Sequence, residues 1–233
     1  LKTKIFYMEN KTVIGFIGAG NMAYALIKGL LSDGFEAKNI NVSDANLELL
    51  EKRSSELGVT TYSDNVSLLT NSDIVVFAVK PQVLSVVCHE LKNKASSDQL
   101  FVSIVAGIRS KDINRWLGGD FALVRTMPNT PALFQSGVTG LYANELVSDG
   151  QKESVTVLLS AVGECFWVNE ENLLDAITAI SGSGPAYFFL MMESMKQAAM
   201  ALGLDEETAD ALSIKTSLGA SIMATNSGKD SRT

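Results

Sequence analysis

The stretch TVIGFIGAGNMA, residues 12–23, decides the fold of this chain. Its first half, TVIGFI, is short, apolar and partly β-branched, a composition that predicts a buried strand. Its second half is a glycine-rich turn, and residues 22–31 beyond the turn have apolar side chains at helical spacing. The stretch therefore predicts a strand, a tight turn and a helix in direct succession.

The small residues of the turn, Gly18, Gly20 and Ala23, have the spacing of a dinucleotide-binding motif. Gly18 permits the tight turn, Gly20 lets the backbone approach a pyrophosphate, and Ala23 keeps the helix close to the strand. Asp44 follows the next expected strand, where an acid that binds the ribose is expected. An incidental glycine-rich turn is the alternative, but the strand, the helix and the acid all favour dinucleotide binding.

Further strand-like and helix-like segments alternate along the chain as far as Val168. The expected strands are residues 39–43, 73–79, 100–105, 121–126, 136–141 and 165–168. The expected helices are residues 47–57, 66–69, a helix that begins at Pro81, a helix capped by Ser110 and ending at Gly118, and residues 153–162. Such alternation predicts an α/β fold, with helices on both faces of a mainly parallel, doubly wound sheet.

The character of the chain changes after about Asn169, where only helices are expected. Residues 186–202 form one apolar-rich helix, and Asp205 caps a second helix that runs to about Thr225. Both are apolar around much of their circumference, whereas a surface helix normally has a polar face. We therefore expect residues 170–233 to be a helical domain that associates with a second subunit, after a first domain of residues 12–169.

Composition excludes several classes of function. The net charge of −7 argues against nucleic acid and anionic membranes as partners. The apolar stretch 176–190 includes Ser181–Pro185 and falls short of a membrane span. A single histidine, His89, argues against a histidine-rich metal site, and no metal is expected. Two distant cysteines, Cys88 and Cys165, suit a reducing, cytoplasmic setting.

Four other segments are candidates for chemistry, and each has a plain structural alternative. Lys80 follows the strongest strand and could contact a ribose or a substrate carboxylate, or be an ordinary surface lysine. Residues 105–107 could lie against a nicotinamide ring or simply end a strand. The proline-rich loop 125–131 could shape a pocket or only connect elements. Residues 181–187, which include Ser183, could bind an anion or form a hinge between domains.

Together these segments resemble the pyrroline-5-carboxylate reductase family. The resemblance rests on GFIGAGNMA (15–23), DIVVFAVKPQ (73–82), SIVAGI (103–108), VRTMPNTPALFQSGVTGL (124–141) and AISGSGPAYFF (179–189). It covers the chain from about Thr12, and its later motifs are more specific than the glycine-rich turn.

The resemblance implies an enzyme that reduces 1-pyrroline-5-carboxylate to L-proline with NAD(P)H, the last step of proline biosynthesis. It implies a Rossmann-type domain followed by an all-helical dimerisation domain, a homodimer or higher oligomer, and a cyclic imino acid as substrate. NADP and NAD are the expected cofactors. The resemblance assigns these cofactor-binding residues: Ile17, Gly18, Ala19, Gly20, Asn21, Met22, Ser43, Asn65, Ala78, Val79, Lys80, Pro81, Val105, Ala106 and Gly107. On the substrate side it points to Lys80 and Ser183.

Family members continue with a loop rich in serine, proline, glycine and threonine that holds the substrate, and this chain ends at Thr233 before it. We therefore expect the helical domain and the substrate site to be incomplete here. Two alternatives to this function remain open. One is another NAD(P)-dependent reductase of the same architecture, such as a β-hydroxyacid dehydrogenase or an imine reductase. The other is a dinucleotide-binding sensor without catalysis.

Overall fold

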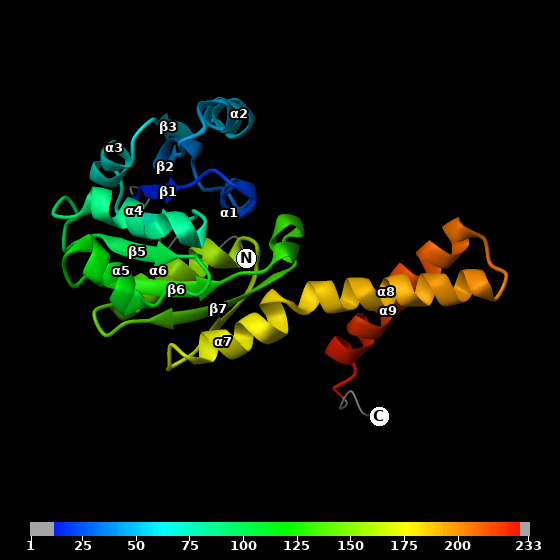
Figure 1. Cartoon of the computed structure of the whole chain (residues 1–233). Coiled ribbons are helices and arrows are strands. Elements are labelled where there is room, and N and C mark those ends of the chain that lie inside the picture. Colours follow the sequence, from blue (N-terminus) through cyan, green and yellow to red (C-terminus); the bar gives the residue numbers. More distant parts are fainter. Residues whose placement is uncertain (1–11, 229–233) are drawn as a thin grey trace. The chain divides into compact units, whose positions relative to one another are not determined.

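The computed structural model describes residues 12–228, which fall into two compact units divided between Gly182 and Ser183 (Figure 1). The change in sequence pattern predicts a domain boundary near Asn169 instead, and the expected helical domain ends in residues that lie outside the described ones. The first unit holds all the strands of the described chain, and the second holds the two longest helices.

Within the described residues, eight strands form one sheet in the order β3-β2-β1-β4-β5-β6-β7-β8. The strands are β1 (Ile14–Ile17), β2 (Ile40–Ser43), β3 (Thr60–Tyr62), β4 (Ile74–Phe77), β5 (Leu100–Ser103), β6 (Ala122–Met127), β7 (Gly137–Ala143) and β8 (Gly163–Trp167). All neighbours are parallel except β6 and β7, which are antiparallel. The predicted doubly wound, mainly parallel sheet is confirmed.

The helices of the first unit cover both faces of this sheet (Figure 1). They are α1 (Asn21–Ser32), α2 (Leu47–Leu57), α3 (Asn65–Thr70), α4 (Pro81–Leu91), α5 (Ser110–Leu117), α6 (Asp149–Ser160) and α7 (Leu173–Ile177). Short helical turns are η2 (Ala37–Asn39), η3 (Thr130–Phe134) and the π-helical η4 (Thr178–Gly182). One core cluster includes side chains of α1, α2 and α6, and the other includes those of α3, α4 and α5.

The strands differ in how deeply their side chains are buried. The central strands β1, β2, β4 and β5 are buried at every position. β4 is a continuous apolar run, as expected of a strand covered on both faces, whereas β2 alternates and its buried Asn41 and Ser43 side chains are hydrogen-bonded. The short edge strand β3 is not predicted by the sequence, because three partly exposed residues, Thr-Thr-Tyr, give no burial signal. Its place is decided by pairing with β2, a tertiary contact.

One predicted helix start was wrong. Ser110 is the first residue of α5 and not its cap. Arg109 occupies the cap position without a side-chain hydrogen bond, and the backbone N–H of Ser110 donates to Oε1 of Glu171 at 2.6 Å. A carboxylate that is distant in sequence therefore takes the role expected of a local serine.

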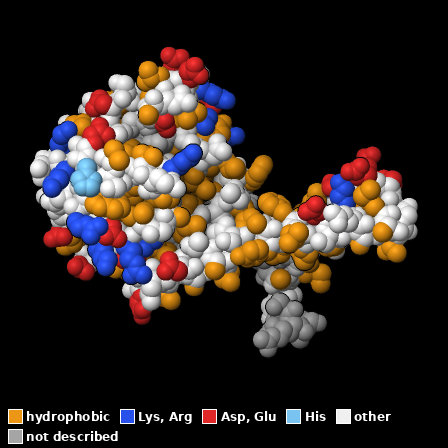
Figure 2. Space-filling model, viewed as in Figure 1, with side chains coloured by type: hydrophobic (Ala, Val, Ile, Leu, Met, Phe, Trp, Pro, Cys, Tyr) orange, Lys and Arg blue, Asp and Glu red, His pale blue; other side chains and the backbone are white. Residues whose placement is uncertain are grey.

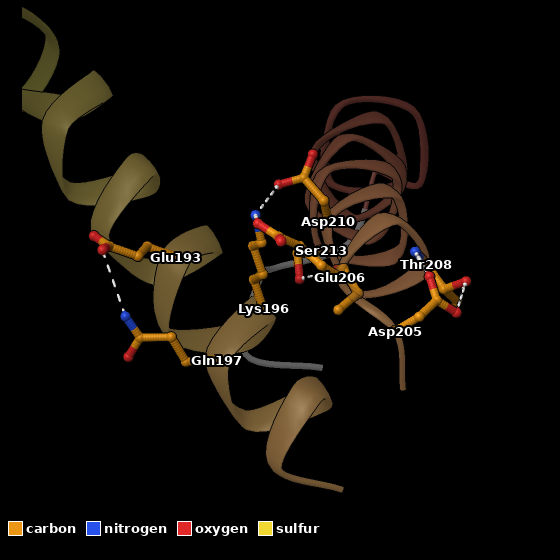
Figure 3. Close-up of polar contacts among 9 residues, drawn as sticks. Glu193, Lys196, Gln197, Asp205, Glu206, Thr208, Asp210 and Ser213 are labelled. Atoms are coloured by element: carbon orange, nitrogen blue, oxygen red, sulfur yellow. Dashed lines mark hydrogen bonds and ion pairs between the residues drawn. The ribbon is translucent and has the colours of Figure 1, made fainter. Parts of the chain in front are cut away.

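The second unit is a helical hairpin of α8 (Gly184–Ala201) and α9 (Glu206–Asn226). As predicted, Asp205 caps α9, because its side chain accepts from the backbone N–H of Thr208. Near the turn, Nζ of Lys196 on α8 contacts carboxylates of Glu206 and Asp210 on α9, at 3.0 and 3.3 Å (Figure 3). These contacts raise the pKa of Lys196 and so keep it charged.

The rest of the hairpin exposes apolar side chains, which are visible along both helices in Figure 2. Phe189 is 64% exposed, Leu202 88% and Met223 70%. By length and composition alone, one helical stretch within residues 12–228, Leu173–Ala201, is long and apolar enough to cross a membrane. The sequence interpretation expected residues 181–185 to interrupt such a stretch, but η4 carries the helix through Gly182.

Candidate functional site

The predicted cofactor residues of the first unit gather at one edge of the sheet. Parallel strands present their carboxyl ends at the same edge, and ligands of open α/β sheets bind there. The backbone continues the pairing past the strands: Gly18 N–H donates to the Ser43 carbonyl at 2.7 Å, and Ala78 N–H donates to the Ile17 carbonyl at 2.8 Å. The segments after β1, β2, β4 and β5 therefore line one edge.

The glycine-rich turn has the geometry that the motif predicts. Gly18 has φ +107°, and a Cβ there would lie 2.5 Å from the carbonyl oxygen of Ala78. Gly20 differs, since its φ is −67° and a Cβ on it would meet nothing within 4 Å. Gly20 is also the N-cap of α1, so open space lies in front of a helix N-terminus. Such a position suits a phosphate group.

Asp44 follows β2 and is engaged by backbone on both carboxylate oxygens. Oδ2 accepts from the N–H of Ala19 at 2.8 Å, and Oδ1 accepts from the N–H of Asn46 at 2.9 Å. The acid therefore lies beside the glycine-rich turn, as the motif predicts. Its hydrogen bonds orient the carboxylate toward the turn, which the sequence pattern did not indicate.

Arg53 also contacts the turn, and the sequence interpretation missed this contact. Its Nε donates to the carbonyl oxygen of Ala19 at 3.1 Å, and its guanidinium lies 4.2 Å from the ring centroid of Tyr24. Arg53 lies about two helical turns beyond the end of β2, so the sequence alone gives no reason to expect contact with the glycine-rich turn. The missed signal is periodic: Arg53 stands three residues after Leu50 and four before Leu57, on the apolar face of α2.

Ser43 and Asn65, both predicted on the adenosine side, are brought together by the fold. The Ser43 hydroxyl donates to Oδ1 of Asn65 at 2.8 Å, and Nδ2 of Asn65 donates to Glu90 at 2.8 Å. Ser43 is 1% exposed, so its hydroxyl is an interior anchor. Asn65 opens α3 and is partly exposed at the same edge.

Lys80 and residues 105–107 complete the edge after β4 and β5. Lys80 is exposed and caps α4 by its backbone, with Pro81 as the first helical residue. Val105 is buried, whereas Ala106 and Gly107 are exposed, and Gly107 has φ +77°. Small exposed residues leave room for a flat ring, and Lys80 is a cation at the same edge.

The proline-rich loop is tied to the π-helical turn by Asn129. Its Nδ2 donates to the Ser181 carbonyl at 3.0 Å, and its Oδ1 accepts from the N–H of Val138 at 2.8 Å. Asn129 therefore links the proline-rich loop to η4 and to the start of β7 within the first unit. Ser183 is the N-cap of α8 and begins the second unit.

A largely buried ion pair joins β6 to the segment just before α7. Nη1 of Arg125 lies 2.9 Å from Oε1 of Glu171, and the two side chains are 8% and 15% exposed. Burial by itself raises the pKa of Glu171, but the hydrogen bonds from Ser110 and Arg125 outweigh it and hold the pKa below its ordinary value. Glu171 is therefore a carboxylate at neutral pH, with a charged partner.

Metal chemistry finds no support in residues 12–228, where no group of three or more histidine, cysteine or acidic side chains is placed to hold an ion. The expected absence of a metal stays a prediction. His89 lies on α4, is exposed, and its Nδ1 is 2.6 Å from the Ser85 carbonyl. It takes no part in the edge described above.

Two family models match the chain. Residues 13–107 match the family described as NADP oxidoreductase coenzyme F420-dependent. Residues 171–233 match the family described as pyrroline-5-carboxylate reductase dimerisation. The first covers the turn, Asp44, Lys80 and the end of β5, and the second begins at Glu171.

Relatives extend the similarity over nearly the whole chain. A pyrroline-5-carboxylate reductase of Pseudomonas aeruginosa is 47% identical over 214 residues, which are 92% of this chain and 78% of the relative. A solved pyrroline-5-carboxylate reductase structure from Coxiella burnetii has a TM-score of 0.91 and 41% identity, and covers 95% and 82% of the two chains. A solved Plasmodium falciparum pyrroline carboxylate reductase, with NADP bound, has a TM-score of 0.85 at 28% identity, over 96% and 82%.

Proposed function

Because the chain belongs to the pyrroline-5-carboxylate reductase family, we propose that it reduces 1-pyrroline-5-carboxylate to L-proline with NADPH or NADH. The observation that carries the proposal is the turn at Gly20, where a helix N-terminus faces open space beside Asp44. A dinucleotide pyrophosphate fits that space, since backbone N–H groups and the helix dipole both favour an anion.

The residues at the edge divide the task of binding the cofactor. Residues 17–22 hold the pyrophosphate, and Ser43 and Asn65 lie toward the adenosine. Residues 78–81 and 105–107 flank the nicotinamide. These assignments are supported by the shared edge of β1, β2, β4 and β5 and by the family resemblance.

The reaction needs orientation more than acid–base chemistry. When bound, the reduced nicotinamide supplies a hydride to the imine carbon, and the imine nitrogen enters carrying its proton. The chain's residues then have to hold two partners in contact, an effect that by itself contributes about 7–11 kcal/mol in well-oriented systems. Lys80 offers a cation to the substrate carboxylate, and Ser183 is the candidate on the helical side.

A turnover assay with pyrroline-5-carboxylate tests the proposal. We expect oxidation of NADPH or NADH that depends on this substrate and yields proline. Turnover of a different imine or of a β-hydroxyacid alone would favour another reductase of this architecture. Cofactor binding without any turnover would favour a sensor.

Cofactor preference is tested at the residue after Asp44. NADP sites usually offer an arginine near the extra phosphate, and Ala45 offers no donor here. We expect both cofactors to work, with NADPH modestly ahead. Ala45→Arg should widen the NADPH preference by roughly 1–3 kcal/mol, the contribution of a charge-assisted hydrogen bond.

Steady-state kinetics with both cofactors, on the wild type and on Ala45→Arg, measure this change in preference. Ala45→Met is the matched control, since it adds length without charge and should leave the ratio nearly unaltered. An equal ratio in all three proteins would show that the residues after β2 do not select the cofactor.

We propose that a second copy of the chain covers the apolar side chains of α8 and α9. The match of residues 171–233 to a dimerisation family and the exposure of residues such as Phe189 and Met223 support this. An interface of that kind is large and apolar. Sedimentation of the full-length protein should show a dimer or a multiple of it, and a stable monomer at micromolar concentration would contradict us.

A cytoplasmic location is proposed on the cysteines. The two cysteines are far apart in sequence, and burial raises the pKa of the Cys88 thiol to about 12, so that it stays protonated and unreactive. Free thiols suit a reducing compartment. The biosynthetic role of the family agrees with this setting.

A further inference from the structure

Two consecutive peptide groups of the glycine-rich turn are held by side chains from outside it. The N–H of Ala19 donates to Oδ2 of Asp44 at 2.8 Å. The C=O of Ala19 accepts from Nε of Arg53 at 3.1 Å. Asp44 comes from the end of β2 and Arg53 from the middle of α2, so a single residue of the turn is held from two elements.

The hydrogen bond from Arg53 determines which way the next amide points. A trans peptide is planar, so its C=O and the following N–H point in opposite directions. The carbonyl of Ala19 is turned toward Arg53, and the N–H of Gly20 therefore points away from it. That N–H belongs to the residue whose missing Cβ leaves open space at the start of α1.

The guanidinium is placed firmly enough to hold this orientation. Arg53 is 7% exposed, lies 4.2 Å from the ring centroid of Tyr24 on α1, and has Nη1 3.2 Å from Oε2 of Glu56. Burying a cation is costly unless it is paired and hydrogen-bonded. Arg53 meets both conditions, with Glu56 as the ion partner and Ala19 as the acceptor.

Charge gives the same residue a second effect. The Ala19 carbonyl oxygen and the Asp44 carboxylate are both part of, or bonded to, the turn that an anionic pyrophosphate would approach. Arg53 binds the carbonyl oxygen and adds a positive charge at the turn. Without it, the turn would present partial and full negative charge to an anion, with less positive charge nearby to offset them.

We propose that Arg53 is a positioning residue for the cofactor, acting through the Ala19 carbonyl to aim the Gly20 amide at the pyrophosphate. It does not itself bind the 2′-phosphate. The inference rests on the proposed function only in that a dinucleotide binds at this turn, and it is independent of the substrate reduced.

Equilibrium titration with NADPH and with NADH, in the absence of substrate, tests the role on Arg53→Met. Methionine keeps the apolar length of the side chain and its contact with Tyr24, but removes the charge and the donor. We expect both cofactors to bind about tenfold more weakly, a loss of about 1.4 kcal/mol in each case. At saturating cofactor, kcat should stay within about twofold, because the reacting groups are untouched.

Arg115→Met is the matched control. Arg115 also pairs with an acid three residues away, Asp112, and its guanidinium lies 6.0 Å from the ring centroid of Trp116. It stands on α5, and both of these partners are on the same helix and away from the glycine-rich turn. Its replacement should leave both cofactor affinities at the wild-type value.

Three results would overturn the assignment. Unchanged affinity in a folded Arg53→Met protein would show that the turn orients its amide without help. Weakening of NADPH alone would show direct contact with the 2′-phosphate instead. A lower kcat at saturation, with affinity intact, would place Arg53 in the chemistry.

Arg53→Lys keeps the question open to test if the methionine variant fails to fold. Lysine retains the charge and one hydrogen-bond donor. We expect the Arg53→Lys protein to bind both cofactors about threefold more weakly than the wild type, an affinity between those of the wild type and Arg53→Met. Wild-type affinity for both cofactors in that case would contradict the proposal. A protein that binds cofactor normally but reduces no pyrroline-5-carboxylate would instead contradict the proposed function.

Discussion

We expect Gly20→Val to weaken cofactor binding severely while the protein stays folded. The valine side chain would occupy the open space in front of α1, where the pyrophosphate is expected, and would hold the phosphates away from the backbone N–H groups. We expect affinity to fall on the order of a hundredfold or more, about 2.7 kcal/mol, for NADPH and NADH alike. Cofactor titration together with circular dichroism measures both parts of the expectation.

The fold should survive because Gly20 has an ordinary backbone conformation. Its φ is −67°, and a Cβ would meet nothing within 4 Å, so the β-carbon of valine is accommodated in an ordinary backbone conformation. Gly18→Ala is the informative contrast. Gly18 has φ +107°, and its Cβ would lie 2.5 Å from the Ala78 carbonyl oxygen, so alanine there should destabilise the fold itself.

Gly150→Val is the matched control for the added side chain. Gly150 is exposed in the first turn of α6, and a Cβ there also meets nothing within 4 Å. It lies away from the carboxyl ends of β1, β2, β4 and β5, so binding should be unchanged. Normal cofactor affinity in a folded Gly20→Val protein would remove the turn from the cofactor site.

Glu171→Ala should lower the free energy of unfolding by about 3 kcal/mol, the typical cost of breaking a buried ion pair. The substitution leaves the Arg125 guanidinium buried without its partner and removes the acceptor for the first N–H of α5. Urea unfolding at pH 7 measures the change. Glu170→Ala, at the exposed neighbouring position, should cost little and serves as the control.

A double-variant cycle separates the pair from its neighbours. Arg125→Met removes the cation, and Arg125→Met combined with Glu171→Ala removes both charges. We expect the double variant to be more stable than the sum of the two single losses predicts, because no unpaired charge is left buried. Strictly additive losses would show that Arg125 and Glu171 stabilise the fold independently.

The contribution of Glu171 depends on pH in a definite direction. Its pKa in the folded protein lies below the ordinary value, so the unfolded chain binds a proton first as the pH falls. The stabilisation is therefore fully present above the unfolded pKa and is lost as the pH falls through the lower folded pKa. The difference in stability between wild type and Glu171→Ala should shrink below about pH 4.

Local sequence was sufficient for most elements and for the cofactor turn. β1, β4 and α2 are set by runs of neighbouring residues, namely continuous apolar β-branched stretches and a helical period closed by Gly58. The turn is decided by Gly18, whose positive φ excludes a side chain, and by Gly20, whose missing side chain leaves the space for a phosphate. These signals are local, so they could be read before any contact was known.

The structure alone decided how distant residues are used. Asp44 bonds to Ala19, Arg53 reaches the same residue from another helix, and Glu171 caps α5 across 61 positions. Each contact depends on strand order, on register and on the packing of helices against the sheet, and no short stretch of sequence encodes these. The sequence by itself thus determined that a dinucleotide turn exists, whereas tertiary structure decided which charged side chains hold it in shape.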